Sequence, residues 1–349
     1  MALAPKIPTS TEVARLAGVS RTTVSFVLND VRNQGISEVT KARVLAAAQD
    51  LGYTPNAAAR TLAGAATGTV GLVIPKAEHL YVDVFLAQLV ASVNQECHRL
   101  GFKLLIESSE GVHPQGGGFV DLVRSRRIDG LLVVNLRRDN HQQLHRLVDE
   151  GIPMVVLGRG VPGEQGFYTV GNDTRASGLT MASHLTGLGH RRIAFVNYAP
   201  PEYHSVNERE DGWRMALSGV GVDAPPEWLE HADISAQSGY LATQRLLARK
   251  TGCTALFAGN DTIAFGALKA LQESGLRVPQ DIALVGFDDI PLAAFAQPAL
   301  TTMRTDAVGH GREAMALLAP LMRGERVRQH VDCQAELIVR ASCGARPAV

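Results

Sequence analysis

The sequence predicts a small all-α helix-turn-helix head followed by an α/β body of two lobes, each built on a doubly wound parallel sheet. The first sixty residues contain short segments with apolar residues at helical spacing, separated by glycines. From Thr69 onward, short apolar runs alternate with helical stretches, which is typical of parallel sheets covered by helices on both faces. At 349 residues the chain exceeds one compact core, for which about 150 residues is usual.

Three helices are predicted in the head. The first is expected to be capped by Ser10 or Thr11, and Gly18 ends it with a tight turn. The second begins after Ser20, which caps it, and the third runs over residues 40–51. Apolar side chains at helical spacing are expected to pack the three together: Val13, Leu16, Ala17, Val24, Val27, Leu28, Val44, Leu45 and Ala48.

The body is expected to alternate strands and helices. The predicted strands cover residues 70–74, 103–106, 130–134, 153–157, 192–196, 255–258 and 282–285. The predicted helices include residues 85–100, 176–188, 211–217, 238–248 and 262–274. So many units favour two lobes that divide near residues 168–175.

These patterns define the expected domains. The head covers residues 1–54, a hinge helix and linker cover 55–68, and the body covers 69–349. Within the body, the first lobe is expected over residues 69–168 with a crossover segment near 303–330. The second lobe is expected over residues 172–300 together with the C-terminal strand.

Charge is distributed unevenly along a chain whose formal net charge is zero. Residues 1–66 hold seven Lys and Arg against four Asp and Glu, a net charge of +3, which leaves −3 on the rest. This asymmetry favours a polyanion-binding head on a near-neutral body. The chain shows no signal-peptide pattern and no membrane-length apolar run, so we expect a cytoplasmic protein without membrane contact.

The strongest motif runs from Thr11 to Asn29 and contains Ala-Gly-Val-Ser-Arg-Thr-Thr-Val-Ser-Phe-Val-Leu-Asn. It resembles the opening of the LacI/GalR family of bacterial transcription regulators. The resemblance implies that the second helix enters the major groove of operator DNA. The residues expected to contact DNA there are Ser20, Arg21, Thr22, Thr23, Ser25, Phe26 and Asn29. The alternative is a helical hairpin that only packs.

Two of these residues carry distinct chemistry. Arg21, just after the start of the helix, is suited to a bidentate pair with guanine, worth about 1 to 3 kcal/mol of discrimination. Phe26 stands where relatives often carry arginine, and it offers only apolar contact, for instance to a thymine methyl.

The segment from Pro55 to Leu62 resembles the hinge helix of the same family. That resemblance implies a helix that folds on the operator in pairs, with Ala59, Arg60 and Leu62 at the minor groove. Independently, a helix this short is marginal in water, and apolar wedges are a known means of bending DNA from the minor groove. The alternative is a plain linker.

The body resembles the family almost to its end, and the resemblance implies an effector site between the lobes. Five residues are expected to line it: Asp83, Phe85, Arg209, Asn260 and Asp288. Carboxylate, amide and guanidinium groups beside an aromatic face suit a polyol, so a sugar or sugar derivative is expected. The chain departs from sugar-responsive relatives at Asp83-Val84, Asp173-Thr174 and Ile234. Asp261 and Asp289 are open to a second interpretation as helix caps.

Other chemistries have little support. Gly158 to Gly163 satisfies G-x-G-x-x-G, but no helix is expected to follow, as a dinucleotide site requires. No metal-ligand spacing or nucleophile elbow occurs, and the four cysteines lie far apart, so no metal and no cofactor are expected.

The expected function is that of a homodimeric transcription regulator, a repressor, that binds a pseudo-palindromic operator under the control of a small effector. Whether that effector is an inducer or a corepressor stays open. A solute-binding protein and an enzyme acting on the same small molecule are the alternatives.

Overall fold

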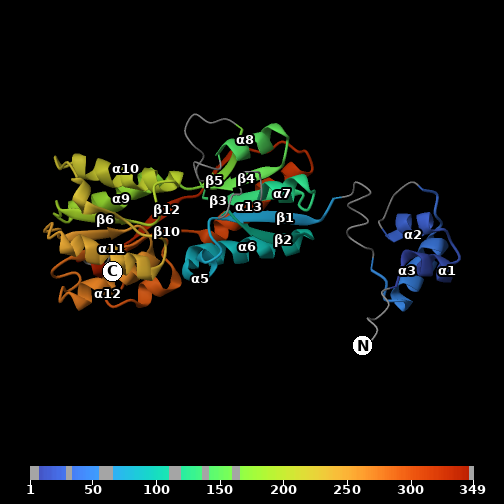
Figure 1. Ribbon diagram of the computed structural model, residues 1–349, viewed down its shortest axis with the longest axis horizontal. Coiled ribbons are helices and arrows are strands. Elements are labelled where there is room, and N and C mark those ends of the chain that lie inside the picture. Colours follow the sequence, from blue (N-terminus) through green and yellow to red (C-terminus); the bar gives the residue numbers. More distant parts are fainter. Residues whose placement is uncertain are drawn as a thin grey trace. The chain divides into compact units, whose positions relative to one another are not determined.

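The structure, a computed structural model, describes residues 8–28, 34–54, 66–109, 119–135, 141–158 and 166–345. The chain divides into two compact units, Met1–Thr67 and Gly68–Val349. In its described residues the first unit has the helices α1 (Ser10–Ala17), α2 (Arg21–Leu28) and α3 (Glu38–Asp50), as Figure 1 shows. Val13, Val24 and Val44 are almost fully buried and join them in one small core.

The turns of the head follow from local chemistry. Thr9 caps α1 through a reciprocal pair, in which its hydroxyl accepts from the Glu12 amide while the Glu12 carboxylate accepts from the Thr9 amide at 2.8 Å. Gly18 ends α1 with φ of 64°, a conformation that costs glycine little. The Ser20 hydroxyl then accepts from the Thr23 amide at 3.0 Å and caps α2.

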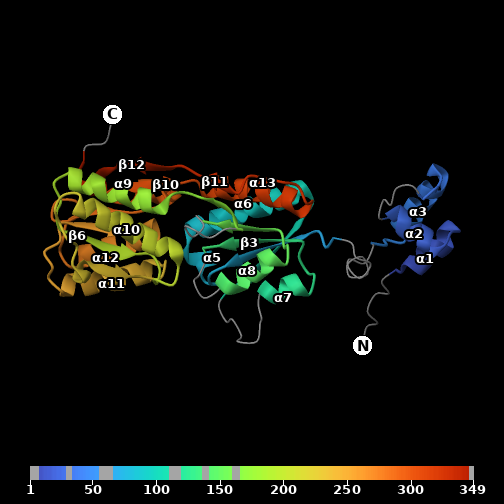
Figure 2. The same cartoon turned by 90° about the horizontal axis from the view of Figure 1, so that it is seen from above.

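The first lobe of the second unit is a six-stranded parallel sheet in the order β11-β5-β4-β3-β1-β2. Its strands are β1 (Thr69–Ile74), β2 (Lys103–Ser108), β3 (Gly130–Val134), β4 (Met154–Leu157), β5 (Tyr168–Gly171) and β11 (His330–Asp332). One face is covered by α6 (Val84–Leu100) and α13 (Ala307–Met322), and the other by α7 (Phe119–Arg124) and α8 (His141–Asp149), as Figure 2 shows. The short helix α5 (His79–Val82) precedes α6. The strands extend from β1 in both directions, so the sheet is doubly wound.

The second lobe repeats this plan on a smaller scale. Its parallel sheet has the order β7-β6-β8-β9, with β6 (Ile193–Asn197), β7 (Leu229–His231), β8 (Ala255–Ala258) and β9 (Ala283–Val285). Helices α9 (Thr174–Gly187) and α10 (His204–Ser218) cover one face, and α11 (Ala236–Ala248) and α12 (Asp261–Glu273) cover the other. Three short 3₁₀ turns complete the lobe: η2 (Pro226–Trp228), η3 (Pro291–Phe295) and η4 (Ala341–Cys343).

The chain passes between the lobes after β5, after β10 (Thr302–Thr305) and again before β12 (Ala335–Ile338). β10 and β12 form an antiparallel pair, with Met303 opposite Leu337. The carboxyl ends of both parallel sheets therefore face a common space, which is where open α/β sheets bind ligands. None of the helices in the described residues has the length and apolarity that crossing a membrane requires.

The predicted fold class is confirmed, with differences in detail. The cap of α1 is Thr9 rather than Ser10 or Thr11, and α10 begins at His204, seven residues before the predicted start. Leu16 and Leu45, expected in the core of the head, are 55% and 53% exposed because Val13 and Val44 fill the small space between the helices. The antiparallel pair of β10 and β12 was not predicted.

Candidate functional site

The start of α2 presents a polar and exposed surface. Arg21, Thr22 and Ser25 are exposed, whereas Val24 one position away is almost fully buried against the other two helices. Phe26 is half-buried, and Thr23 is engaged with the Ser20 hydroxyl at 2.9 Å. The helix is therefore anchored on one side and free to meet a nucleic-acid groove on the other. Asn29, Ala59, Arg60 and Leu62 lie outside the described residues.

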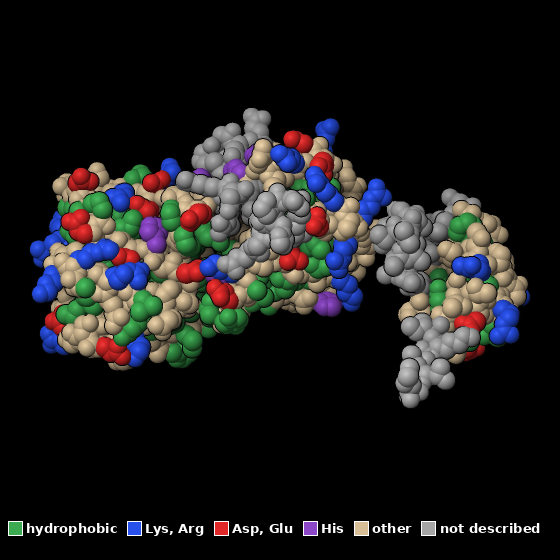
Figure 3. Space-filling model, viewed as in Figure 1, with side chains coloured by type: hydrophobic (Ala, Val, Ile, Leu, Met, Phe, Trp, Pro, Cys, Tyr) green, Lys and Arg blue, Asp and Glu red, His purple; other side chains and the backbone are tan. Residues whose placement is uncertain are grey.

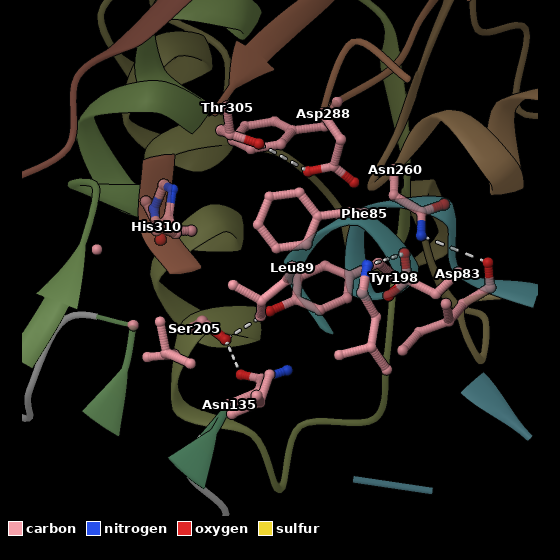
Figure 4. Close-up of a pocket in the computed structure, with 18 of the residues that line it drawn as sticks. Asp83, Phe85, Leu89, Asn135, Tyr198, Ser205, Asn260, Asp288, Thr305 and His310 are labelled. Atoms are coloured by element: carbon pink, nitrogen blue, oxygen red, sulfur yellow. Dashed lines mark hydrogen bonds between the residues drawn. The ribbon is translucent and has the colours of Figure 1, made fainter. Parts of the chain in front are cut away.

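A cavity lies between the two lobes of the second unit, at the carboxyl ends of both parallel sheets (Figure 4). It encloses about 850 Å³ of space when the part open to solvent is included. The five residues that the sequence predicted for an effector site all line it: Asp83, Phe85, Arg209, Asn260 and Asp288. They come from α6, α10, the end of β8 and the loop after β9, so only the tertiary fold brings them together.

Arg209 is buried at the inner wall of this cavity. Its guanidinium carbon lies 3.5 Å from the centre of the Phe287 ring and 4.5 Å from that of Tyr198, and it donates to the Gly259 carbonyl. The two rings hold the planar group in a fixed orientation through cation–π contacts. Burial lowers the pKa of Arg209, with Tyr198 and Asp288 acting in the opposite direction. Such a held guanidinium is suited to orienting a polar ligand.

Two carboxylates face the cavity from opposite lobes. Asp83 caps α6 by accepting from the Leu86 amide at 3.3 Å, and Asp288 accepts from the Thr305 hydroxyl at 3.2 Å. Burial raises the pKa of Asp83 to about 6. Burial also raises the pKa of Asp288 well above its usual range, while the nearby Arg209 lowers it. Perturbed carboxyls that line a cavity are typical of functional sites.

Polar side chains that the sequence did not single out complete the wall. Ser205 of the second lobe donates to Asn135 of the first, and Tyr198 bonds to the same Ser205 hydroxyl. His310 contributes from α13, and its ring meets the Phe85 ring edge-on with 6.0 Å between their centres. In the view of Figure 4, Phe85 stands between Asp288 above and Tyr198 below. These residues lie far apart along the chain and carry no local motif, so the sequence offered no signal for them.

Backbone conformation also marks this region. Asn135, Ile234 and Asp288 line the cavity with positive φ angles of 56°, 61° and 107°. Side chains other than glycine adopt such angles at a cost, and strained positions of this kind gather at ligand sites.

The neighbouring acids have structural roles that differ from helix capping. Asp261 is fully buried, and it accepts from the Thr302 hydroxyl at 2.7 Å and from the Ile290 amide at 2.9 Å. Asp289 pairs with Arg340 at 2.6 Å and Arg304 at 2.8 Å. Both acids hold the loop after β9 and thereby place Asp288. The cap of α12 is Asn260, whose side-chain oxygen accepts from the Ile263 amide at 2.7 Å. The glycine-rich run after Gly158 lies outside the described residues.

Comparison with known proteins agrees with this architecture. A sequence model described as "Bacterial regulatory proteins, lacI family" matches residues 9–56. A second, described as "Periplasmic binding protein-like domain", matches residues 182–343.

Full-length relatives match nearly the whole chain. The "HTH-type transcriptional regulator CelR" of Thermobifida fusca is 36% identical over 342 residues, covering 96% of this chain and 98% of that protein. The "HTH-type transcriptional repressor PurR" of Pectobacterium carotovorum is 34% identical, covering 96% of this chain and 97% of that protein.

Solved structures agree in fold as well. The "transcriptional regulator CelR-cellobiose complex" is 33% identical with a TM-score of 0.72, covering 96% of this chain and 99% of that one. The lac repressor dimer bound to operator and the anti-inducer ONPF is 28% identical with a TM-score of 0.82, covering 97% of this chain and 100% of that one. These relatives are named as transcriptional regulators, in contrast to the solute-binding and enzymatic alternatives. The chain therefore belongs to the lacI family of bacterial regulatory proteins, and it is a DNA-binding transcriptional regulator.

Proposed function

We propose that this regulator is a cytoplasmic repressor that binds an inverted-repeat operator as a homodimer, and that a small polar effector in the cavity between the lobes controls its affinity. The observation that carries this proposal is the joining, in one chain, of a head with an exposed polar helix start to a two-lobed body with a polar cavity. An effector changes DNA affinity only by binding one arrangement of the lobes more tightly than another.

The DNA-binding surface in this proposal is the start of α2 and the hinge. Ser20, Arg21, Thr22, Thr23 and Ser25 would meet bases and phosphates in the major groove, with Phe26 at its edge. The hinge residues Ala59, Arg60 and Leu62, together with Asn29, remain predictions from the sequence. Half-sites are expected about one helical turn apart.

The effector site in this proposal consists of Asp83, Phe85, Arg209, Asn260 and Asp288. Relatives with this architecture include one solved with cellobiose. The polar groups at the carboxyl ends of both sheets, beside the aromatic face of Phe85, support a sugar or sugar derivative as the ligand. Contacts from both lobes would favour the closed arrangement over an open one.

The dimer in this proposal uses an apolar face where the lobes meet. Tyr81 on α5 and Phe295 on η3 are 79% and 84% exposed, and Leu292 is 59% exposed. Both elements belong to the same hydrophobic cluster region, because Val82 and Ala296 pack against the cluster that includes Ala293. Figure 3 shows hydrophobic side chains gathered over this part of the surface. Large apolar side chains grouped in this way favour contact with a second copy of the chain.

The decisive experiment is selection of binding sites from random duplex DNA by the full chain. We expect enrichment of one inverted-repeat sequence with half-sites about one helical turn apart. Enrichment of no sequence, from a preparation that is folded and dimeric by light scattering, contradicts the proposal.

The proposed dimer surface is tested separately by light scattering. Phe295→Glu should shift the protein to monomers, whereas Met215→Glu on the outer side of α10 should leave it dimeric.

A further inference from the structure

The charges that line the effector cavity are unbalanced toward the negative. Among the described residues at its wall, Asp83 and Asp288 carry carboxylates and Arg209 carries the one guanidinium. Asp83 comes from the first lobe and Asp288 from the second, so the carboxylates approach a bound ligand from both sides. A ligand with its own negative charge would meet repulsion here, and one with a positive charge would complete the balance.

The wall of the cavity offers a ligand more hydrogen-bond acceptors than donors, because several donors already bond to other groups of the protein. Thr305 donates to Asp288, Ser205 donates to Asn135, and the Asn260 amide donates to the Ile234 carbonyl at 3.4 Å. A carboxylate has about four acceptor positions, so Asp83 retains free ones after its bonds to the Leu86 and Phe85 amides, and Asp288 after its bond to Thr305.

One histidine at the wall adds an acceptor, and a second has a buried ring nitrogen without a partner among the described residues. His310 Nδ1 lies 2.7 Å from the Asp306 carbonyl, which places the proton of the neutral ring on that nitrogen and leaves Nε2 as an acceptor. His79 is 1% exposed, and its Nε2 faces Asp233 Oδ1 at 3.3 Å. Its Nδ1 has no hydrogen-bond partner among the described residues. A buried polar atom without a partner beside a cavity is expected to be satisfied by what binds there.

Electrostatic coupling across the cavity supports the same conclusion. Burial raises the pKa of Asp83 to about 6, against the lowering effect of His79. Burial also raises the pKa of Asp288, and the neighbouring Asp83 and Asp261 raise it further while Arg209 lowers it. A cation bound between the two carboxylates would offset both the loss of water and the mutual repulsion. Phe85 and Leu89 supply an apolar surface for the rest of the ligand.

Given the proposed effector function of this cavity, we propose that the effector carries a protonated amino group, as an amino sugar does, and that this group binds between Asp83 and Asp288. Charge-assisted hydrogen bonds to both carboxylates would then hold the lobes together around the ligand.

The proposal is tested by calorimetric titration of the full chain at pH 7.5 with matched sugars. The panel is glucosamine, galactosamine and mannosamine, each with its neutral parent sugar and its N-acetyl derivative, together with glucuronate. We expect at least one amine to bind about tenfold tighter than its neutral parent, as a charge-assisted hydrogen bond allows. Acetylation should remove the advantage, and glucuronate should be the weakest ligand.

Two variants connect the preference to the carboxylates. Asp83→Asn removes the charge while keeping a side chain that caps a helix equally well, so α6 should stay folded. It should reduce the ratio of amine to parent affinity to near one, whereas the exposed control Asp223→Asn should leave that ratio unchanged. A second readout is proton release at pH 6, measured in buffers of different ionisation enthalpy, because a bound cation lowers the pKa of Asp83.

The outcomes separate this inference from the function on which it rests. Binding of neutral sugars with no advantage for any amine overturns the amine proposal and leaves the cavity as the effector site. An advantage that survives Asp83→Asn also overturns it. If no sugar of either kind binds, the amino-sugar proposal and the proposed sugar class both fail.

Discussion

Lys76 of the first lobe and Asp233 of the second lobe form an ion pair across the edge of the effector cavity, with 2.6 Å between Nζ and Oδ2. The His79 ring nitrogen 3.3 Å from Asp233, followed by the Lys76 ammonium, lowers the pKa of this carboxyl to about 2. Together with the contact of Ser205 to Asn135, this pair connects the two lobes in the arrangement seen here.

Asp233→Asn is therefore expected to weaken the contact between the lobes. Because the pair is partly exposed, the effect should be small, about a two- to fivefold loss of effector affinity. Asp211→Asn breaks an exposed pair with Arg175 inside the second lobe and serves as the control. Calorimetric titration measures both variants, and an equal effect of the two substitutions would show that the pair between the lobes has no special role.

The raised carboxyl pKa of Asp83 predicts an unusual dependence of stability on pH. Its pKa of about 6 lies above the unfolded value of 3.8, so between these limits the folded state binds more protons than the unfolded one. This group's contribution to stability is therefore greatest at low pH and is lost as pH rises toward 6.

Asp83→Asn should consequently raise Tm at pH 7.5 and have a smaller effect near pH 4.5. Asp223→Asn should change Tm at neither pH. Each kcal/mol of relief corresponds to about 2 to 4 °C for a domain of this size. Calorimetric melting of the ligand-free chain at both pH values measures it. A lower Tm at pH 7.5 would mean that the carboxylate stabilises the empty cavity.

Arg21→Ala is expected to relax base preference at one position in each half-site by about 1 to 3 kcal/mol. Arg21→Lys is the informative companion, because it keeps the charge and loses the planar fork that pairs with guanine. Competition binding with single-base operator variants separates the cases. Uniform weakening on every sequence would identify Arg21 as a phosphate contact.

Arg209→Ala is expected to abolish the effector's influence on operator binding while leaving operator affinity intact, since the substitution removes the guanidinium held between Tyr198 and Phe287. Arg214→Ala, on the same helix and paired with Glu210, is the matched control. Fluorescence anisotropy with labelled operator, with and without ligand, measures both. A retained response would place the effector elsewhere.

The position of Arg209 depends on close contact between two helices. A Cβ added at Gly178 of α9 would stand 2.7 Å from the Arg209 carbonyl, and one at Gly212 of α10 would overlap the Arg175 carbonyl. Gly212→Ala should therefore separate α9 from α10, lower Tm and weaken effector binding together. Gly187→Ala, where nothing lies within 4 Å of the added carbon, should do neither. Unchanged melting of Gly212→Ala would show that the helices adjust freely.

Much of the fold could be predicted because its signals are local. Gly18 and Ser20 mark the turn between α1 and α2, and the apolar runs at β1, β3 and β8 match the predicted strands almost residue for residue. The predictions that failed concern competition for space. Leu16 has the right spacing for the core, but Val13, Val24 and Val44 fill the space between the helices, so Leu16 stays exposed.

The sequence by itself determined the head and the alternating strands and helices, because capping and periodicity act over a few residues. The five residues predicted for the cavity came from the resemblance to the LacI/GalR family. Tertiary structure alone decided that Asn135, Ser205 and Tyr198 join the same wall, and that Lys76 meets Asp233 across 157 positions of sequence. It also decided the charge of the site. Burial between two lobes changes the pKa of Asp83 and Asp288, and burial is a property of packing that no local pattern records.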